Sequence, residues 1–95
     1  MSPKITQRFD SVWDALESDP SAAENMRLRS ELMLGISEQV RSRGWTQTVA
    51  AKQCSIAQPR LNDLLRGKID RFSLDALVNI AAALGLRVRM TIHAA

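Results

Sequence analysis

The chain of 95 residues has no tyrosine, and all aromatic residues together make up only 4% of it. This scarcity argues against a surface that stacks RNA bases or single-stranded bases. One cysteine excludes an internal disulfide, and one histidine offers no cluster of metal ligands. No apolar run is long enough to span a membrane, and the first residues show no secretory signal. We therefore expect a cytoplasmic protein without metal or cofactor.

The sequence also lacks the usual signatures of an enzyme. It contains no glycine-rich loop that could cradle a phosphate and no pairing of a nucleophile with a base. We interpret Cys54 as a small core residue rather than a nucleophile. With 45% apolar residues the chain can bury one small core, which oligomerisation would supplement.

Charge is distributed unevenly along the chain. Residues 1–40 carry four basic and seven acidic side chains, whereas residues 41–95 carry nine basic and three acidic ones. The second part would attract a phosphate backbone, and the first part would be repelled by it. The acidic part is therefore available for a different partner.

The periodicity of apolar residues predicts a mainly helical fold of about five helices. We expect residues 1–20 to form an arm with a short helix from Ser11, and residues 21–95 to form the main domain. A capping box at Ser21 and Glu24 predicts the start of a long helix that reaches about Arg43. Further helices are predicted at 47–54, 58–66 and 74–84, with a loop over 68–72.

The stretch 45–68 predicts two short helices joined by a tight turn. Thr46 is a natural N-cap, Pro59 suits a first helical turn, and Gly67 suits the residue after a helix end. In the second helix, Leu61, Leu64 and Leu65 share one face. The opposite face and its flanks carry Gln58, Pro59, Arg60, Asn62, Asp63 and Arg66. This polar ridge is either a surface for the DNA major groove or an ordinary solvated face, and the basic surroundings favour DNA.

The last part of the chain changes period from helical to alternating. Leu86, Val88, Met90 and Ile92 alternate with polar residues, which predicts a half-buried β-strand. A lone strand leaves its backbone groups unpaired, so we expect a second copy to supply an antiparallel partner. The resulting homodimer would place two reading helices about 34–36 Å apart on a palindromic operator.

Residues 44–86 resemble the helix-turn-helix domain of the lambda-repressor-like (XRE/Cro) DNA-binding proteins. The resemblance rests on Thr46-Gln47, Ala51, Ile56, Leu61, Leu64, Arg66-Gly67-Lys68, Ser73-Leu74 and Ala83-Leu84-Gly85. More narrowly, the chain is similar to HigA-like antitoxins. That similarity rests on Gln58-Pro59-Arg60-Leu61, Leu65-Arg66-Gly67-Lys68, Phe72-Ser73-Leu74-Asp75 and the terminal alternation. Ser55 stands where the family usually has glycine, so it must adopt the turn conformation at some steric cost.

The resemblance implies a role for each matching residue. Gln47 would bind a phosphate or brace Gln58, and Gln58 would read a base edge with Pro59, Asn62 and Asp63 beside the bases. The residues implied to hold phosphates or to border the DNA are Arg60, Arg66, Lys68 and Thr46.

Two functions remain, and a third is set aside. The chain is either a repressor that is also the antitoxin of a RelE/HigB-like ribonuclease toxin, or a free-standing XRE-family regulator. The small basic toxin would then be a second partner beside double-stranded DNA. An enzyme is not expected.

Overall fold

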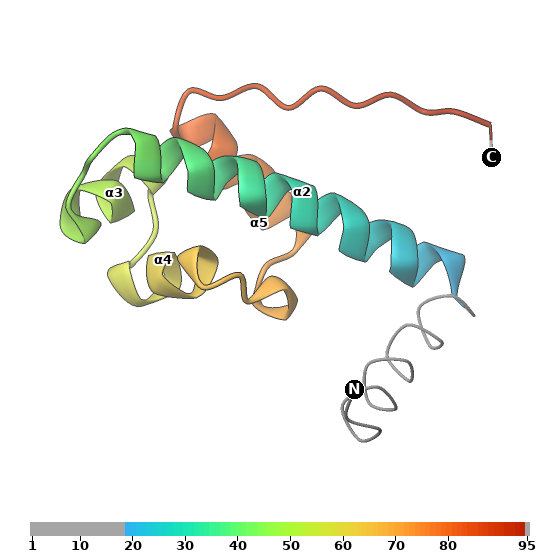
Figure 1. The fold of residues 1–95 in the computed structure, drawn as a ribbon, viewed down its shortest axis with the longest axis horizontal. Coiled ribbons are helices and arrows are strands. Elements are labelled where there is room, and N and C mark those ends of the chain that lie inside the picture. The colour runs from blue at the N-terminus through green and yellow to red at the C-terminus, as the bar shows by residue number, and fades with distance from the viewer. Residues whose placement is uncertain (1–18, 95) are drawn as a thin grey trace, which may run out of the picture.

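The computed structural model describes residues 19–94, and this part of the chain is mainly helical, as predicted (Figure 1). Its helices are α2 (Pro20–Ser42), α3 (Gln47–Cys54), α4 (Gln58–Leu65) and α5 (Leu74–Ala83). A 3₁₀ turn, η1 (Ile69–Arg71), lies between α4 and α5, where the sequence predicted a loop. The short helix predicted from Ser11 lies outside the described residues. None of the described helices is long and apolar enough to cross a membrane.

The N-cap of the long helix α2 lies two residues before the position that the sequence predicted. Asp19, not Ser21, is the N-cap, and its carboxylate accepts hydrogen bonds from the N–H groups of Ser21 and Ala22 at 3.1 and 3.3 Å. Pro20 follows at the first helical position, where a residue without an N–H loses nothing. Ser21 therefore lies inside the helix. At the other end α2 stops at Ser42, close to the predicted Arg43.

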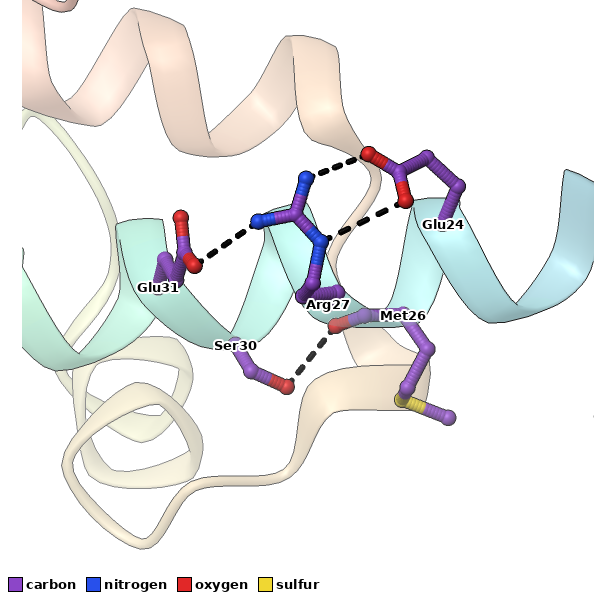
Figure 2. A network of polar contacts seen from close by, with 5 residues as sticks. All are labelled: Glu24, Met26, Arg27, Ser30 and Glu31. Atoms are coloured by element: carbon purple, nitrogen blue, oxygen red, sulfur yellow. Dashed lines mark hydrogen bonds and ion pairs between the residues drawn. The ribbon is translucent and has the colours of Figure 1, made fainter. Parts of the chain in front are cut away.

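An ion-pair network covers one exposed side of α2 (Figure 2). Arg27 donates hydrogen bonds to Glu24 one turn before it and to Glu31 one turn after it, the latter at 2.9 Å. The hydrogen bond from Arg27 lowers the pKa of Glu24 below its ordinary value. Side chains three or four residues apart on a helix are neighbours, so these pairs stabilise α2 itself rather than its packing.

The core lies where α2 and α5 pack together, with α3 and α4 closing its other sides. Cys54 is 1% exposed, which confirms its interpretation as a core residue, and burial raises the pKa of its thiol. The largest side chains that are almost completely buried are Phe72, Ile36, Leu61, Leu64 and Leu77.

The prediction of a β-strand over residues 86–92 is wrong, because the described part of the chain contains no strand there. Residues 86–94 form an extended segment that runs back along α2, on the opposite side of that helix from α4 in Figure 1. The N–H of Leu86 donates to the carbonyl of Ala81 at 2.9 Å, and no later residue of the segment makes a backbone hydrogen bond within residues 19–94. A β-ladder needs a neighbouring strand, and the described part of this chain supplies none.

The turn between α3 and α4 depends on one unusual backbone conformation. Ser55 is the C-cap of α3 and adopts φ 59° and ψ 38°, the left-handed region that glycine enters without penalty. Its N–H donates to the carbonyl of Lys52, and the N–H of Ile56 donates to that of Ala51. The left-handed conformation expected of Ser55 is therefore confirmed.

Replacing Ser55 with glycine should raise the free energy of unfolding by up to about 1 kcal/mol, since it removes the Cβ from a left-handed residue. The gain is limited because glycine also gains entropy in the unfolded chain. Denaturant titration of the two proteins measures the difference.

Gly67 provides the matched control, because it has φ +75° and a Cβ added to it would meet no other atom within 4 Å. Gly67→Ser should lower stability by a similar amount. A Ser55→Gly variant that is clearly less stable than the parent would contradict this explanation of the turn.

Candidate nucleic-acid interface

The helix α3 holds the turn and the next helix in place through its small buried side. Thr46 is its N-cap, as predicted, and the hydroxyl accepts a hydrogen bond from the N–H of Val49 at 3.3 Å. Ala50 and Ala51 are buried, so α4 can cross α3 closely. Gln47 is exposed at the first position of α3.

The helix α4 has one completely buried side and one exposed polar side. Leu61 and Leu64 are 0% exposed, which matches the apolar face that the sequence predicted, and Leu65 is half-buried. This division leaves a ridge of hydrogen-bonding and cationic groups at the surface. Its exposed members are Gln58, Pro59, Arg60, Asn62 and Arg66.

Gln58 is held by Thr48 rather than by Gln47. The hydroxyl of Thr48 donates a hydrogen bond to Oε1 of Gln58 at 3.4 Å, across the turn between the two helices. Within the described residues no hydrogen bond joins Gln47 to Gln58. Thr48 carries no sequence signal beyond its place on the exposed side of α3, so only the crossing of the helices reveals this contact. With its oxygen held, Gln58 keeps its amide N–H groups available.

Asp63 lies on the flank of the ridge and is paired with two cations. Its Oδ2 is 3.2 Å from Nη1 of Arg71, and its Oδ1 is 3.7 Å from Nζ of Lys68. Only 24% of the Asp63 side chain is exposed. The sequence analysis predicted Asp63 and Lys68 as site residues but missed Arg71. Arg71 contacts Asp63 because the turn η1 places it beside α4.

Arginine side chains also fix the segment that follows α4. Arg41 donates to the carbonyl of Leu65 at 3.0 Å, Arg29 donates to that of Ile69 at 3.0 Å, and Arg60 donates to that of Arg71 at 3.3 Å. The last carbonyls of a helix have no partner within it and carry partial negative charge, so a guanidinium is a favourable donor there. Two of these arginines come from α2, which ties the end of α4 and η1 to the longest helix.

Arg60 has a second contact that restricts its side chain. Its guanidinium carbon lies 4.4 Å from the centre of the Phe72 ring, and Phe72 itself is 1% exposed. This cation–π contact and the bond to Arg71 hold the guanidinium against η1. Arg66, in contrast, is exposed and forms no ion pair among residues 19–94.

The four predicted dimerisation residues differ in exposure along the extended segment. Leu86 and Val88 are half-buried and pack against the core, whereas Met90 is 63% exposed and Ile92 is 91% exposed. Among the described residues no group of histidine, cysteine or carboxylate side chains could hold a metal ion.

Comparison with known families identifies the arrangement. A family model described as a helix-turn-helix domain matches residues 16–93. The chain belongs to this helix-turn-helix family. Helix-turn-helix domains are the DNA-binding units of transcription regulators, and the chain is accordingly a DNA-binding regulator. A comparison with curated proteins gave no match.

In helix-turn-helix proteins the second helix of the unit lies in the major groove, and the first crosses the backbone. In this chain the second helix is α4 and the first is α3. The exposed ridge of α4 is therefore the candidate surface for contacts with base edges.

Proposed function

We propose that the chain is a sequence-specific transcriptional repressor that inserts α4 into the major groove of its operator. One observation carries the proposal. Two leucines with 0% exposure anchor α4, and the opposite side of this short helix presents amide and guanidinium groups to solvent. Such groups match the donors and acceptors that base pairs expose in the major groove.

The exposed residues divide into base-reading and phosphate-binding groups. Gln58 and Asn62 pair well with adenine, and Pro59 packs on a thymine methyl. Gln47 and Thr46, at the start of α3, would lie beside the sugar-phosphate backbone of the DNA. The cations that would hold phosphates without reading sequence are Arg60, Arg66 and Lys68.

Two substitutions separate these roles in DNA binding. Arg66→Ala should weaken binding to every duplex and flatten its salt dependence, because one phosphate contact and its released counterions are lost. Gln58→Ala should cost about 1–3 kcal/mol at particular base pairs and leave the salt dependence unchanged. Fluorescence anisotropy with DNA from upstream of the gene, and with a scrambled duplex, measures both effects.

Glu38→Ala is the matched control, since this exposed carboxylate belongs to α2 and not to the ridge. The proposal fails if the parent and both variants bind the upstream and scrambled duplexes alike.

We further propose that the regulator is the antitoxin of a toxin–antitoxin pair. The similarity to HigA-like antitoxins supports this, together with the excess of carboxylates in residues 1–40, which suits a small basic ribonuclease. The antitoxin would repress its own operon and neutralise the toxin. The second candidate is a free-standing XRE-family regulator, which needs the same ridge but no acidic partner surface.

A neighbouring gene distinguishes these two candidates. If the adjacent reading frame encodes a small basic RelE-like protein, coexpression should restore growth that the neighbour alone arrests, and the two proteins should copurify. Arg66→Ala should keep this neutralisation while losing DNA affinity, because Arg66 belongs to the basic surface. A neighbour that arrests growth despite the intact chain would support the free-standing regulator.

We propose a homodimer held partly by residues 86–92. The supporting observation is an extended segment whose backbone forms no hydrogen bonds beyond Leu86 within the described residues. Beneath it runs a groove of about 440 Å³ against α2, lined in part by Leu28, Leu32 and Val88. A second copy related by a two-fold axis would pair the free backbone groups and cover Met90 and Ile92.

Met90→Asp should convert the dimer into monomers and weaken operator binding strongly. Met90 is 63% exposed in the single chain, so the substitution spares the core, whereas like charges facing each other across a strand pair repel. Analytical ultracentrifugation at micromolar concentration measures the change.

Thr91→Asp adds the same charge one position away, on the other side of the segment, and should weaken the dimer less. A parent chain that sediments as a monomer refutes the proposed dimer.

A further inference from the structure

Both oxygens of the Asp63 carboxylate lie near cations, although this residue belongs to the helix proposed to read DNA. One oxygen faces Lys68 at 3.7 Å and the other faces Arg71 at 3.2 Å. A carboxylate that reads cytosine needs an oxygen that the exocyclic amine can reach. In this chain both oxygens have a cation in front of them, and three quarters of the side chain is already covered, since 24% is exposed.

The two cations come from the segment that leaves the recognition helix, and both retain access to solvent. The side chain of Lys68 is 39% exposed and that of Arg71 is 59% exposed. Each can therefore reach a phosphate only while it weakens or shares its pair with Asp63. The main-chain bonds from Arg29 and Arg60 to this segment keep the two cations near Asp63.

We propose that Asp63 competes with DNA phosphates for Lys68 and Arg71 and thereby limits sequence-independent binding. This inference rests on the proposed DNA-binding function, and it adds that Asp63 sets how tightly the chain binds DNA of any sequence. Non-specific affinity comes almost entirely from phosphate contacts that release counterions. A carboxylate that occupies two cations beside the recognition helix lowers this component directly. The base contacts of Gln58 and Asn62 do not involve it.

The test is the binding of full-length Asp63→Asn to a duplex of random sequence across a salt series of about 50–200 mM. Asparagine keeps the shape of the side chain and removes its charge. We expect binding about twofold to tenfold tighter at the low-salt end, since each exposed ion pair is weak. The slope of log affinity against log salt should also steepen by roughly 1–2, because up to two more phosphate contacts form.

Asp70→Asn is the matched control. It makes the same change of net charge on the neighbouring turn η1, at an exposed carboxylate that forms no ion pair within the described residues. It should tighten binding less than Asp63→Asn and leave the slope unchanged. Adding Arg71→Gln to Asp63→Asn should remove most of the gain, which a double-mutant cycle quantifies. Thermal melts confirm that each variant is folded at the temperature of measurement.

Three results would overturn the inference while leaving the DNA-binding function intact. Weaker binding to all duplexes with a shallower slope would mean that Asp63 orients the cations toward phosphates. A loss of discrimination at one base pair, with random-sequence affinity unchanged, would make it a base-reading residue. Equal effects of Asp63→Asn and Asp70→Asn would reduce its role to net charge. A parent chain that binds neither operator nor random duplex would overturn both proposals.

Discussion

The burial of Leu61 and Leu64 is the constraint on which the rest of the site depends. Helix α4 has eight residues, and an isolated helix shorter than about 12–15 residues is marginal in water. It also begins without a side-chain cap, since its N-cap is Ala57. Tertiary packing must therefore hold it, and two leucines at 0% exposure each contribute on the order of 1.5–3 kcal/mol. Because these two positions supply the anchoring, packing does not constrain the residues on the opposite face of α4.

Several cations in the basic half of the chain have partners within the fold. Arg41 and Arg60 donate to main-chain carbonyls, and Lys68 and Arg71 share the carboxylate of Asp63. These contacts use positive charge to fix the end of α4 and the turn η1, where unpaired carbonyl oxygens accumulate. Charge counting predicted which half of the chain would attract DNA, but it could not show which of its cations have partners within the fold. Those partners depend on contacts such as that of Arg41 with Leu65, 24 residues apart in the sequence.

Local signals predicted α3, α4 and α5 well, because each has a clear start and stop. Thr46 is the N-cap of α3 as the sequence indicated, Ser73 is the N-cap of α5, and glycines with positive φ follow α4 and α5 at Gly67 and Gly85. The start of α2 was misplaced because Asp19 and Ser21 are both good caps, and Pro20 at the first helical position favours the earlier one. The bond between Thr48 and Gln58 could not be predicted, because it depends on how closely two helices cross.

The extended segment shows what an alternating pattern can and cannot establish. Alternation predicts which side chains share a face, and Leu86 and Val88 do pack against the core. It does not establish that the backbone is paired, because pairing requires a neighbouring strand. Burial falls along the segment, from half-buried Leu86 to Ile92 at 91% exposure. Leu86 and Val88, at the near end, are therefore covered by packing against the core. Met90 and Ile92, at the far end, are exposed and have no such cover among the described residues. A partner that completes this segment must consequently act at Met90 and Ile92, which places the axis of the proposed dimer near the far end.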